Sequence, residues 1–210
     1  MDANFWLRRW ENNEIGFHER EANPLLLKYF DKLCLTEGKR VFIPLCGKTL
    51  DIAWFLSKGY RVAGAELSKL AVGQLFEGLG LEPTITTLGE LEHYSAQNID
   101  IFVGDLFKLS SELLGPVDAI YDRAALVALP EPTRILYTAH LMAISAKAPQ
   151  LLICYEYDNS QMDGPPFSIT SAEVKQHYSA SYTLTLLESL DVPDGFKRKF
   201  PATESVWLLA

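Results

Sequence analysis

The sequence predicts an α/β fold in which about seven strands form a mostly parallel sheet, with helices on both faces and an antiparallel strand at one edge. Apolar runs of strand length alternate with segments of helical periodicity, which is typical of a parallel sheet. At residues 41–45 the apolar run is almost unbroken, as expected of a strand covered on both faces. The chain has 210 residues, 48% of them apolar, and no linker or internal repeat divides it. We therefore expect residues 1–210 to form a single domain.

Residues 39–66 are predicted to form a strand, a tight turn, a helix and a second strand. The first strand covers residues 41–45 and ends at a turn around Gly47. Apolar residues at helical spacing over residues 50–57 predict the helix, and the glycine that follows can end it. Residues 60–65 return to an extended pattern. A unit of this kind is half of a nucleoside-binding fold.

The rest of the chain continues the alternation of helices and strands. Two strands near the C-terminus are joined by a polar loop, and we expect them to pair as an antiparallel hairpin at the edge of the sheet. The predicted helices cover residues 68–77, 131–145 and 171–178, and the predicted strands cover residues 98–103, 117–121, 150–157, 183–190 and 205–209.

The turn after the first strand does not match the two common phosphate-binding motifs. Gly47-Lys48-Thr49 looks like the end of a P-loop, but the first glycine of that motif would stand at Phe42, inside the strand. The dinucleotide motif has three glycines, whereas residues 45–50 contain one. The remaining candidate ligand for this turn is a nucleoside without phosphates. S-adenosylmethionine fits that description, with its methionine end over this turn.

Glu66 ends the second predicted strand and stands 19 residues after Gly47. A carboxylate at this place can accept two hydrogen bonds from the hydroxyls of a ribose. The other interpretation is that Glu66 only caps the helix that begins near Ser68. We favour the ribose contact.

Further polar residues follow two other predicted strands. The carboxyl ends of parallel strands meet at one edge of a sheet, so these residues can share a site with Glu66. The Asp105 carboxylate can accept from the amino group of adenine, and Leu106 can cover the face of the ring. Arg123 can pair with the carboxylate of the cofactor or reach the substrate. Alternatively, Arg123 forms a surface salt bridge with Asp122 or Asp118.

The composition disfavours several classes of partner. The net charge is −8, so a protein that binds nucleic acid through its phosphates is not expected. No stretch reaches the roughly 20 apolar residues that cross a bilayer, and the N-terminus lacks the features of a signal peptide. We therefore expect a cytoplasmic protein without a membrane partner, and a monomer, because no exposed apolar stripe is obvious.

The cysteines and histidines do not predict a metal site. The three cysteines are odd in number and lack metal-ligand spacing, which suits a reducing compartment. The four histidines have no short spacing to one another or to a cysteine pair. We interpret Cys46, in the predicted cofactor turn, as a packing residue rather than a nucleophile.

Five segments together resemble the thiopurine S-methyltransferase family in its shorter bacterial form. The similarity covers essentially the whole chain, and the motifs occur in the same order. They are FWLRRWENNEIGFHE, PLCGKTLDIAWFLSKGYRVAGAELS, GDLFKL, DRAALVALP and GPPFSI. The resemblance implies a class I S-adenosylmethionine-dependent methyltransferase (Rossmann-like) fold. It also implies S-adenosylmethionine as methyl donor and S-methylation of aromatic or heterocyclic thiols such as thiopurines.

The resemblance also implies roles for individual residues. Phe17 matches the position that lines both the cofactor and the acceptor pocket. The implied cofactor contacts are Trp10, Leu45, Glu66, Asp105, Leu106 and Arg123, of which Asp105 and Leu106 lie at the adenine.

Two segments are expected to cover the site. Residues 1–35 are predicted to be a helical lid over the cofactor, although a tryptophan pair one helical turn apart, such as Trp6 and Trp10, more often belongs to the core. The glycine and prolines that precede Phe167 predict a second lid that presents this ring to the acceptor. An ordinary surface turn with one buried phenylalanine explains that segment equally well.

Arg123 is the predicted catalytic residue, because a cation beside the acceptor favours its thiolate form. Arg198 is a weaker candidate. Two other functions stay open: a methyltransferase of the same fold that acts on another small nucleophile, such as a halide, inorganic sulfur, selenium or tellurium species, and a non-catalytic binder of S-adenosylmethionine.

Overall fold

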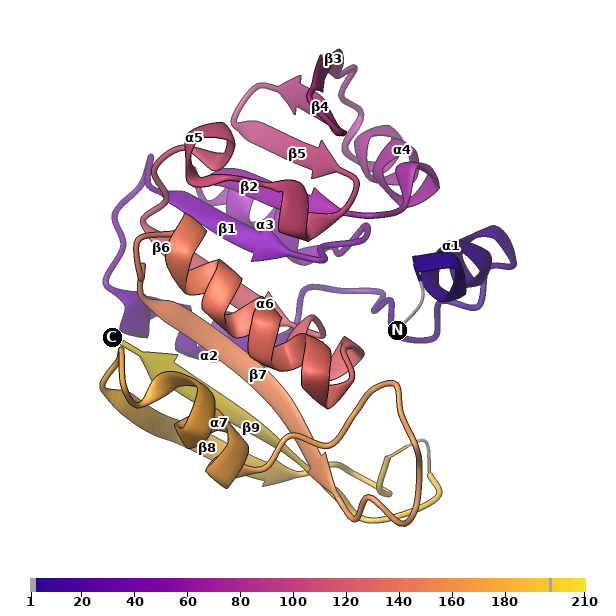
Figure 1. The fold of residues 1–210 in the computed structure, drawn as a ribbon, viewed down its shortest axis with the longest axis vertical. Coiled ribbons are helices and arrows are strands. Elements are labelled where there is room, and N and C mark those ends of the chain that lie inside the picture. Colours follow the sequence, from indigo (N-terminus) through magenta and orange to yellow (C-terminus); the bar gives the residue numbers. More distant parts are fainter. Residues whose placement is uncertain (1–2, 197) are drawn as a thin grey trace.

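The protein is built on one nine-stranded sheet, seen in a computed structural model that describes residues 3–196 and 198–210 (Figure 1). The strand order is β3-β4-β5-β2-β1-β6-β7-β9-β8. The five central strands are parallel: β1 (Arg40–Pro44), β2 (Arg61–Glu66), β5 (Ile99–Val103), β6 (Ala119–Arg123) and β7 (Gln150–Tyr157).

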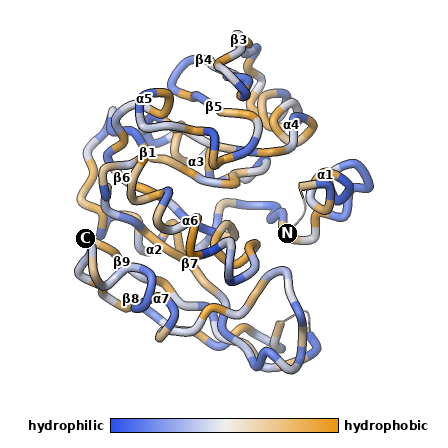
Figure 2. Tube along the Cα trace, viewed as in Figure 1, coloured by the Kyte–Doolittle hydropathy of each residue, from blue (hydrophilic) through white to orange (hydrophobic). Residues whose placement is uncertain are grey.

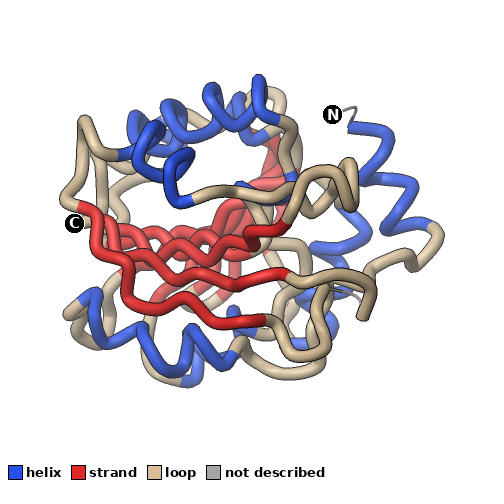
Figure 3. Tube along the Cα trace, turned by 90° about the horizontal axis from the view of Figure 1, so that it is seen from below, coloured by secondary structure: helices blue, strands red, loops and turns tan. Residues whose placement is uncertain are grey.

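The central strands are apolar because both faces of the sheet are covered. Side chains in β1 such as Val41, Phe42 and Ile43 are at most 2% exposed. Helices α2, α3 and α4 pack on one face and α5, α6 and α7 on the other. Figure 3 shows helices on both sides of the sheet. Figure 2 shows β5 as a mostly hydrophobic segment. The predicted helices on both faces are confirmed.

The predicted helices are found at their predicted positions, and the structure adds short helices that were not predicted. Together they are α1 (Ala3–Glu11), α2 (Pro24–Tyr29), α3 (Asp51–Ser57), α4 (Lys69–Leu79), α5 (Ser111–Leu114), α6 (Glu131–Ile144) and α7 (Ser171–Tyr178), with the 3-10 turns η1 (Phe30–Leu33), η2 (Leu106–Lys108) and η3 (Leu126–Ala128). None of the helices within residues 3–196 and 198–210 has the length and apolar character needed to cross a bilayer.

The sheet has nine strands rather than about seven because the prediction missed β3 (Thr84–Leu88) and β4 (Leu91–Ala96). These strands pair antiparallel with each other, and β4 pairs antiparallel with β5. Four of the five residues of β3 are exposed, so its sequence carries no apolar alternation. At the other edge, β8 (Leu184–Asp191) and β9 (Ala202–Leu209) form the predicted antiparallel hairpin.

The strand order places a crevice at the carboxyl ends of the parallel strands. The chain runs from β1 to β2 on one side and later places β6 on the other side of β1, so the connections diverge there. Ligands of open α/β sheets bind at such a point. Figures 1 and 3 show the N-terminal helix α1 beyond the same ends of the strands.

Candidate active site at the carboxyl ends of the parallel strands

A cavity of about 560 Å³ lies where β1, β2, β5 and β6 end. Its walls come from the turns that follow these strands, from α1 and the segment after it, and from the loop that contains Pro165 and Pro166. This size is in the range of small-molecule sites. All six predicted cofactor residues and Phe17 line the cavity, so the fold brings them together from positions far apart in the sequence.

The strands end in sharp turns with positive φ angles. Leu45, directly after β1, has a φ of 47°, and Ala124, directly after β6, has a φ of 65°. Residues other than glycine rarely adopt this conformation, and it persists only where the surrounding structure enforces it. Gly104, after β5, has a φ of 140°. These turns bend the chain away from the sheet at the rim of the cavity.

The Glu66 carboxylate connects the turn after β1 with the turn after β2. One oxygen, Oε2, accepts from the backbone N–H of Gly47 at 2.8 Å, and the other, Oε1, accepts from that of Ser68 at 2.8 Å. The cap of α4 is Ser68 itself, whose hydroxyl accepts from the N–H of Ala71 at 3.2 Å. Capping is therefore not the main role of Glu66. Each carboxylate oxygen has a second acceptor site, so Glu66 can still accept from a ligand.

Burial sets the protonation behaviour of Glu66 and Cys46. Burial raises the pKa of Glu66, although backbone N–H groups of Ser68, Gly47 and Leu67 stabilise its ionised form. Burial, and secondarily the Glu66 charge, raises the pKa of the Cys46 thiol well above its usual value. Cys46 is 5% exposed. Its thiol is neutral at physiological pH, which agrees with the predicted packing role.

The adenine-site candidates occupy the turn after β5. Asp105 is exposed, and its Oδ1 accepts from the N–H of Phe107 at 3.0 Å. Leu106 is 6% exposed and begins η2. The predicted adenine contact requires an accessible carboxylate beside a buried apolar side chain, and Asp105 and Leu106 have this arrangement.

Three aromatic rings from the N-terminal segment form the roof of the cavity. Phe17 makes edge-to-face contacts with Trp6 and Trp10, at centroid distances of 5.8 and 5.5 Å. Trp10 is 5% exposed and lies directly over Gly47. A Cβ atom at Gly47 would stand 2.9 Å from the Trp10 ring, so glycine is what allows the roof to approach the turn. Both tryptophans line the cavity and also pack with other rings.

Arg123 ends β6 and forms an ion pair with Glu19, not with the predicted surface partners. Both of those alternatives are wrong. Asp118 pairs with Lys39 at 2.8 Å, and Asp122 accepts from the hydroxyl of Tyr137 at 2.7 Å. Burial lowers the pKa of the Arg123 guanidinium, but Glu19 and nearby oxygen groups outweigh it, and the pKa is raised. Arg123 is therefore a permanent cation at the wall of the cavity.

Two residues that were predicted to contact the acceptor, Phe167 and Arg198, lie outside this cavity. Phe167 does not line the cavity, because its backbone N–H donates to the carbonyl of Val127 at 2.6 Å and its ring packs on the core beside Arg134. Pro165 and Pro166 take its place in the wall. The description of this segment as a turn with one packed phenylalanine fits better than the prediction that Phe167 faces the acceptor.

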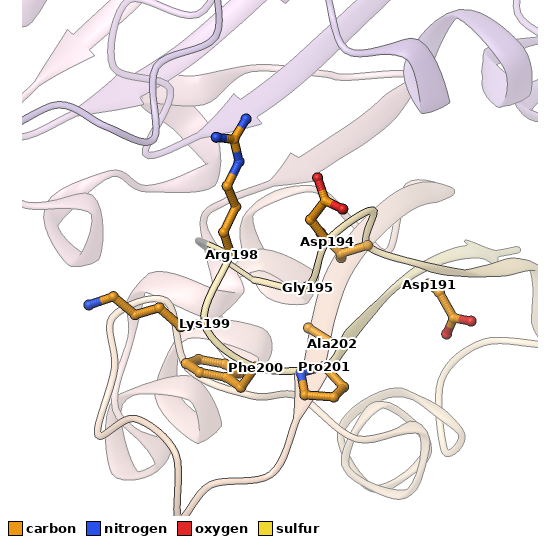
Figure 4. Close-up of a pocket in the computed structure, with 9 residues that line it drawn as sticks. Asp191, Asp194, Gly195, Arg198, Lys199, Phe200, Pro201 and Ala202 are labelled. Carbon is orange, nitrogen blue, oxygen red and sulfur yellow. The ribbon is translucent and has the colours of Figure 1, made fainter.

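Arg198 lies in the loop between β8 and β9, beside a separate hollow of about 440 Å³. Figure 4 shows Arg198 and Lys199 projecting from this loop in different directions. Arg198 does not line the cavity at the strand ends. The structure therefore brings Arg123, and not Arg198, to the candidate site.

Several residues that line the cavity were not among the predicted site residues, including His18, Glu19 and Tyr155. Burial and then the charges of Lys48 and Arg123 lower the pKa of His18, so its ring is neutral at pH 7. Glu19 follows Phe17 and His18 in the N-terminal motif, and that proximity was the available signal. Its pairing with a residue at the end of β6 is a product of the tertiary fold.

Comparison with known proteins decides the family. The sequence model described as "Thiopurine S-methyltransferase (TPMT)" matches residues 1–207. The chain belongs to this family. It is 51% identical to the thiopurine S-methyltransferase of Xanthobacter autotrophicus, over 100% of this chain and 99% of the relative. It is 47% identical to that of Gluconobacter oxydans, over 98% of this chain and 94% of the relative.

Solved structures support the fold. A SAM-dependent methyltransferase from Anabaena variabilis superposes with a TM-score of 0.65 at 16% identity, covering 99% of this chain and 95% of that one. The 1,6-didemethyltoxoflavin-N1-methyltransferase of Burkholderia thailandensis, solved with its acceptor and S-adenosylhomocysteine, gives 0.66 at 17% identity, covering 99% and 87%. The predicted class I methyltransferase fold is confirmed.

Membership of the thiopurine S-methyltransferase family also establishes the kind of activity. The chain is an S-adenosylmethionine-dependent methyltransferase, so the open alternative of a non-catalytic binder is wrong. Within the described residues no group of three or more His, Cys, Asp or Glu side chains could hold a metal ion. The prediction that the reaction needs no metal stays a prediction.

Proposed function

We propose that this methyltransferase acts on the sulfur of aromatic and heterocyclic thiols, thiopurines among them, in the cavity at the strand ends. The observation that carries the proposal is the convergence of Trp10, Leu45, Glu66, Leu106 and Arg123 on one cavity, beneath an aromatic roof. The names of the full-length bacterial relatives support the choice of acceptor.

The residues of the cavity fit an adenosyl group with a charged sulfur. Glu66 is fixed by two backbone donors and keeps acceptor sites for ribose hydroxyls. We assign Asp105 and Leu106 to the adenine, and Leu45 and Trp10 to the methionine end. An aromatic face near a sulfonium contributes roughly 0.5 to 2 kcal/mol, depending on desolvation, and Trp10 lies directly over the turn where that group would stand.

We assign the acceptor to the space between Phe17, Arg123 and the Pro165-Pro166 pair, since all four line the same cavity. Apolar walls of this kind hold a flat ring. The Arg123 guanidinium is the cation that stabilises negative charge on the acceptor sulfur. The backbone hydrogen bond from Phe167 to Val127 fixes the chain directly after Pro165 and Pro166.

Catalysis by this site is mainly a matter of positioning. S-adenosylmethionine supplies an activated methyl group on a positively charged sulfur. The chain has to hold the acceptor sulfur in line with that methyl, and such positioning contributes up to roughly 7 to 11 kcal/mol. A heteroaromatic thiol ionises readily near neutral pH, so Arg123 needs only to favour the thiolate, and no strong base is required.

We also propose that residues 3–19 act as a lid on a single domain of residues 1–210. The rest of the segment predicted as a lid, with α2 and η1, packs in the core on one face of the sheet instead. The support for the lid is that Trp6, Trp10 and Phe17 contact the site through their rings, while α1 lies beyond the strand ends (Figure 1). A closed aromatic roof keeps water from the reacting methyl.

We propose further that the enzyme is a cytoplasmic monomer. Cys34, Cys46 and Cys154 are free thiols, as is usual in a reducing compartment.

One experiment tests the function. The purified protein is mixed with labelled S-adenosylmethionine and 6-mercaptopurine, and methylated product is measured by chromatography. We expect turnover by the natural chain. Glu66→Gln should weaken S-adenosylhomocysteine binding by about ten- to a hundredfold in calorimetry, because a hydrogen bond to a charged group is lost.

The control is Glu82→Gln, which removes the same charge at an exposed position of the loop before β3. It should bind like the natural chain. Cofactor binding without any methylated thiol would contradict the proposed acceptor. Unchanged binding by Glu66→Gln would contradict the assignment of Glu66 to the ribose.

A further inference from the structure

The Arg123 cation does not face the cavity alone, because a carboxylate from the lid segment covers it. Glu19 lies between α1 and α2, and its Oε1 pairs with a terminal nitrogen of Arg123. The side chain of Arg123 is 10% exposed and that of Glu19 is 38% exposed. Both residues line the cavity, so an acceptor that reaches Arg123 also meets Glu19.

Buried groups hold Glu19 in this orientation. Its second oxygen, Oε2, accepts from Nδ2 of Asn23 at 3.4 Å. Asn23 is 2% exposed and caps α2, where its Oδ1 accepts from the N–H groups of Leu25 at 2.9 Å and Leu26 at 3.3 Å. An exposed ion pair usually contributes little because two flexible side chains must be ordered. The Glu19 carboxylate is already ordered, because Arg123 binds one of its oxygens and Asn23 binds the other.

Asn23 is itself held by α3, the helix of the strand-helix-strand unit over residues 39–66. The backbone N–H of Asn23 donates to Oδ1 of Asp51 at 2.7 Å, and the Tyr121 hydroxyl donates to Oδ2 of the same carboxylate at 3.1 Å. Asp51 is 1% exposed and begins α3. Glu19 is therefore fixed relative to the sheet, not only to the lid.

The charges around Arg123 are mostly negative. Asp51 and Glu19 both raise the pKa of Arg123 against the effect of burial. Glu204 stands opposite Tyr155 in the pairing of β7 with β9. Burial raises the pKa of Glu204, while Tyr155 and Arg123 act against that shift. The acceptor end of the cavity thus presents the Arg123 cation together with carboxylates that partner it, of which Glu19 makes the direct contact.

Glu19 keeps the capacity to bind an acceptor. A carboxylate has about four acceptor sites, and Arg123 and Asn23 use two of those on Glu19. A ring N–H beside the sulfur, as in the thione form of a heterocyclic thiol, can donate to a remaining site. When such a neutral acceptor reacts, the new sulfur–methyl bond forms as the bond from the methyl to the departing thioether breaks, and the ring proton passes to the Glu19 carboxylate and then to water. An acceptor with its own carboxylate would instead be repelled by Glu19.

We propose that Glu19 determines acceptor specificity: it favours neutral heterocyclic thiols with a ring N–H near the sulfur and disfavours thiols that carry a carboxylate. The inference rests on the proposed function, since it places the acceptor beside Arg123. Glu19 is a specificity residue and not the source of the rate, because the in-line transfer itself requires no strong base.

The test compares three acceptors in the full chain: 6-mercaptopurine, 4-methylbenzenethiol and 4-mercaptobenzoate. The last two are similar in size and differ in charge. For each, kcat/KM is measured in the natural chain, in Glu19→Gln and in Glu21→Gln. Glu21 is an exposed residue of the same segment, and no ion pair involves it among the described residues. Its variant removes an equal charge.

We expect Glu19→Gln to raise the ratio of kcat/KM for 4-mercaptobenzoate over 4-methylbenzenethiol by about tenfold, because a like charge is removed. The ratio for 6-mercaptopurine over 4-methylbenzenethiol should fall several-fold. Glu21→Gln should change neither ratio by more than about twofold. If Glu19 only held the lid, its loss would slow all three acceptors alike and leave both ratios unchanged.

Unchanged ratios in Glu19→Gln, with turnover of the neutral thiols by the natural chain, would overturn this inference and leave the proposed function intact. No turnover of any thiol by a natural chain that binds S-adenosylhomocysteine would overturn both. Glu19→Ala serves as a second variant, and circular dichroism confirms that each variant is folded.

Discussion

The hydroxyl of Tyr137 donates a 2.7 Å hydrogen bond to Oδ2 of Asp122, one residue before the Arg123 cation. Asp122 is fully buried, and its Oδ1 accepts from the N–H of Leu126 at 3.1 Å. The carboxylate thus connects the end of β6, the turn that follows it and helix α6. Tyr137 also lines the cavity, so this buried pair lies directly under the acceptor wall.

We predict that Asp122 makes the protein less stable as pH rises from about 4 to 7. Burial raises the pKa of Asp122 to about 6, although Tyr137 and two backbone N–H groups stabilise the ionised form. A raised pKa means that the folded state binds the proton more tightly than the unfolded state. The stability that this proton contributes is present below the unfolded pKa and is lost as pH rises through about 6.

The measurement is urea unfolding of the natural chain and of Asp122→Asn at several pH values from 4 to 7. The free energy of unfolding of the natural chain should fall by about 1 to 3 kcal/mol relative to the variant over this range. Other titrating groups are common to both proteins and cancel in the difference. A difference that does not vary with pH would show that the folded state does not raise the pKa of Asp122.

The close approach of Trp10 to Gly47 gives a second prediction. Gly47→Ala places a methyl group 2.9 Å from the Trp10 ring at a residue whose φ is 52°. Trp10 must move, and the roof over the turn must open with it. We expect the dissociation constant for S-adenosylhomocysteine to rise about tenfold, which corresponds to about 1.4 kcal/mol.

Gly89→Ala is the matched control for backbone strain. Gly89 has a φ of 62° in the turn between β3 and β4, and a Cβ atom there would meet nothing within 4 Å. Both variants should lose about 1 kcal/mol of stability from the strained backbone. Cofactor affinity should fall in Gly47→Ala alone. An equal effect in both variants would assign the loss to general destabilisation and not to the contact with Trp10.

The central fold was predictable because its signals are local. The strand at 41–45 is covered on both faces, so nearly every residue in it had to be apolar. The strand β3 was missed for the opposite reason: its exposed threonines need no core contact and follow no apolar pattern. Its place is fixed by pairing with β4, which the sequence does not reveal.

The site was predictable to the extent that it follows the strand ends. Leu45, Glu66 and Arg123 stand at the ends of parallel strands, and topology brings such positions together. The position of Phe167 depends on one backbone hydrogen bond to Val127, and the partner of Arg123 depends on how the lid folds back. Contacts of this kind join distant segments and leave no periodic signal in the sequence.

The last prediction concerns the thiol in the cofactor turn. Burial raises the pKa of Cys46 well above its usual value, whereas Cys34 is exposed in the segment before β1. The thiolate is the reactive form of cysteine, and access is also needed. At pH 8, iodoacetamide should therefore modify Cys34 at least about a hundredfold faster than Cys46, as measured by peptide mass spectrometry.

Methyl transfer should survive this treatment, because the reaction needs no enzyme thiol. Cys34→Ser should abolish the rapid labelling and keep the full rate of methyl transfer. Rapid modification of Cys46 in the folded chain, with loss of turnover in step, would mean that its thiol is ionised and accessible. In that case the packing role of Cys46 against Gly64 would be insufficient to explain its place in the turn.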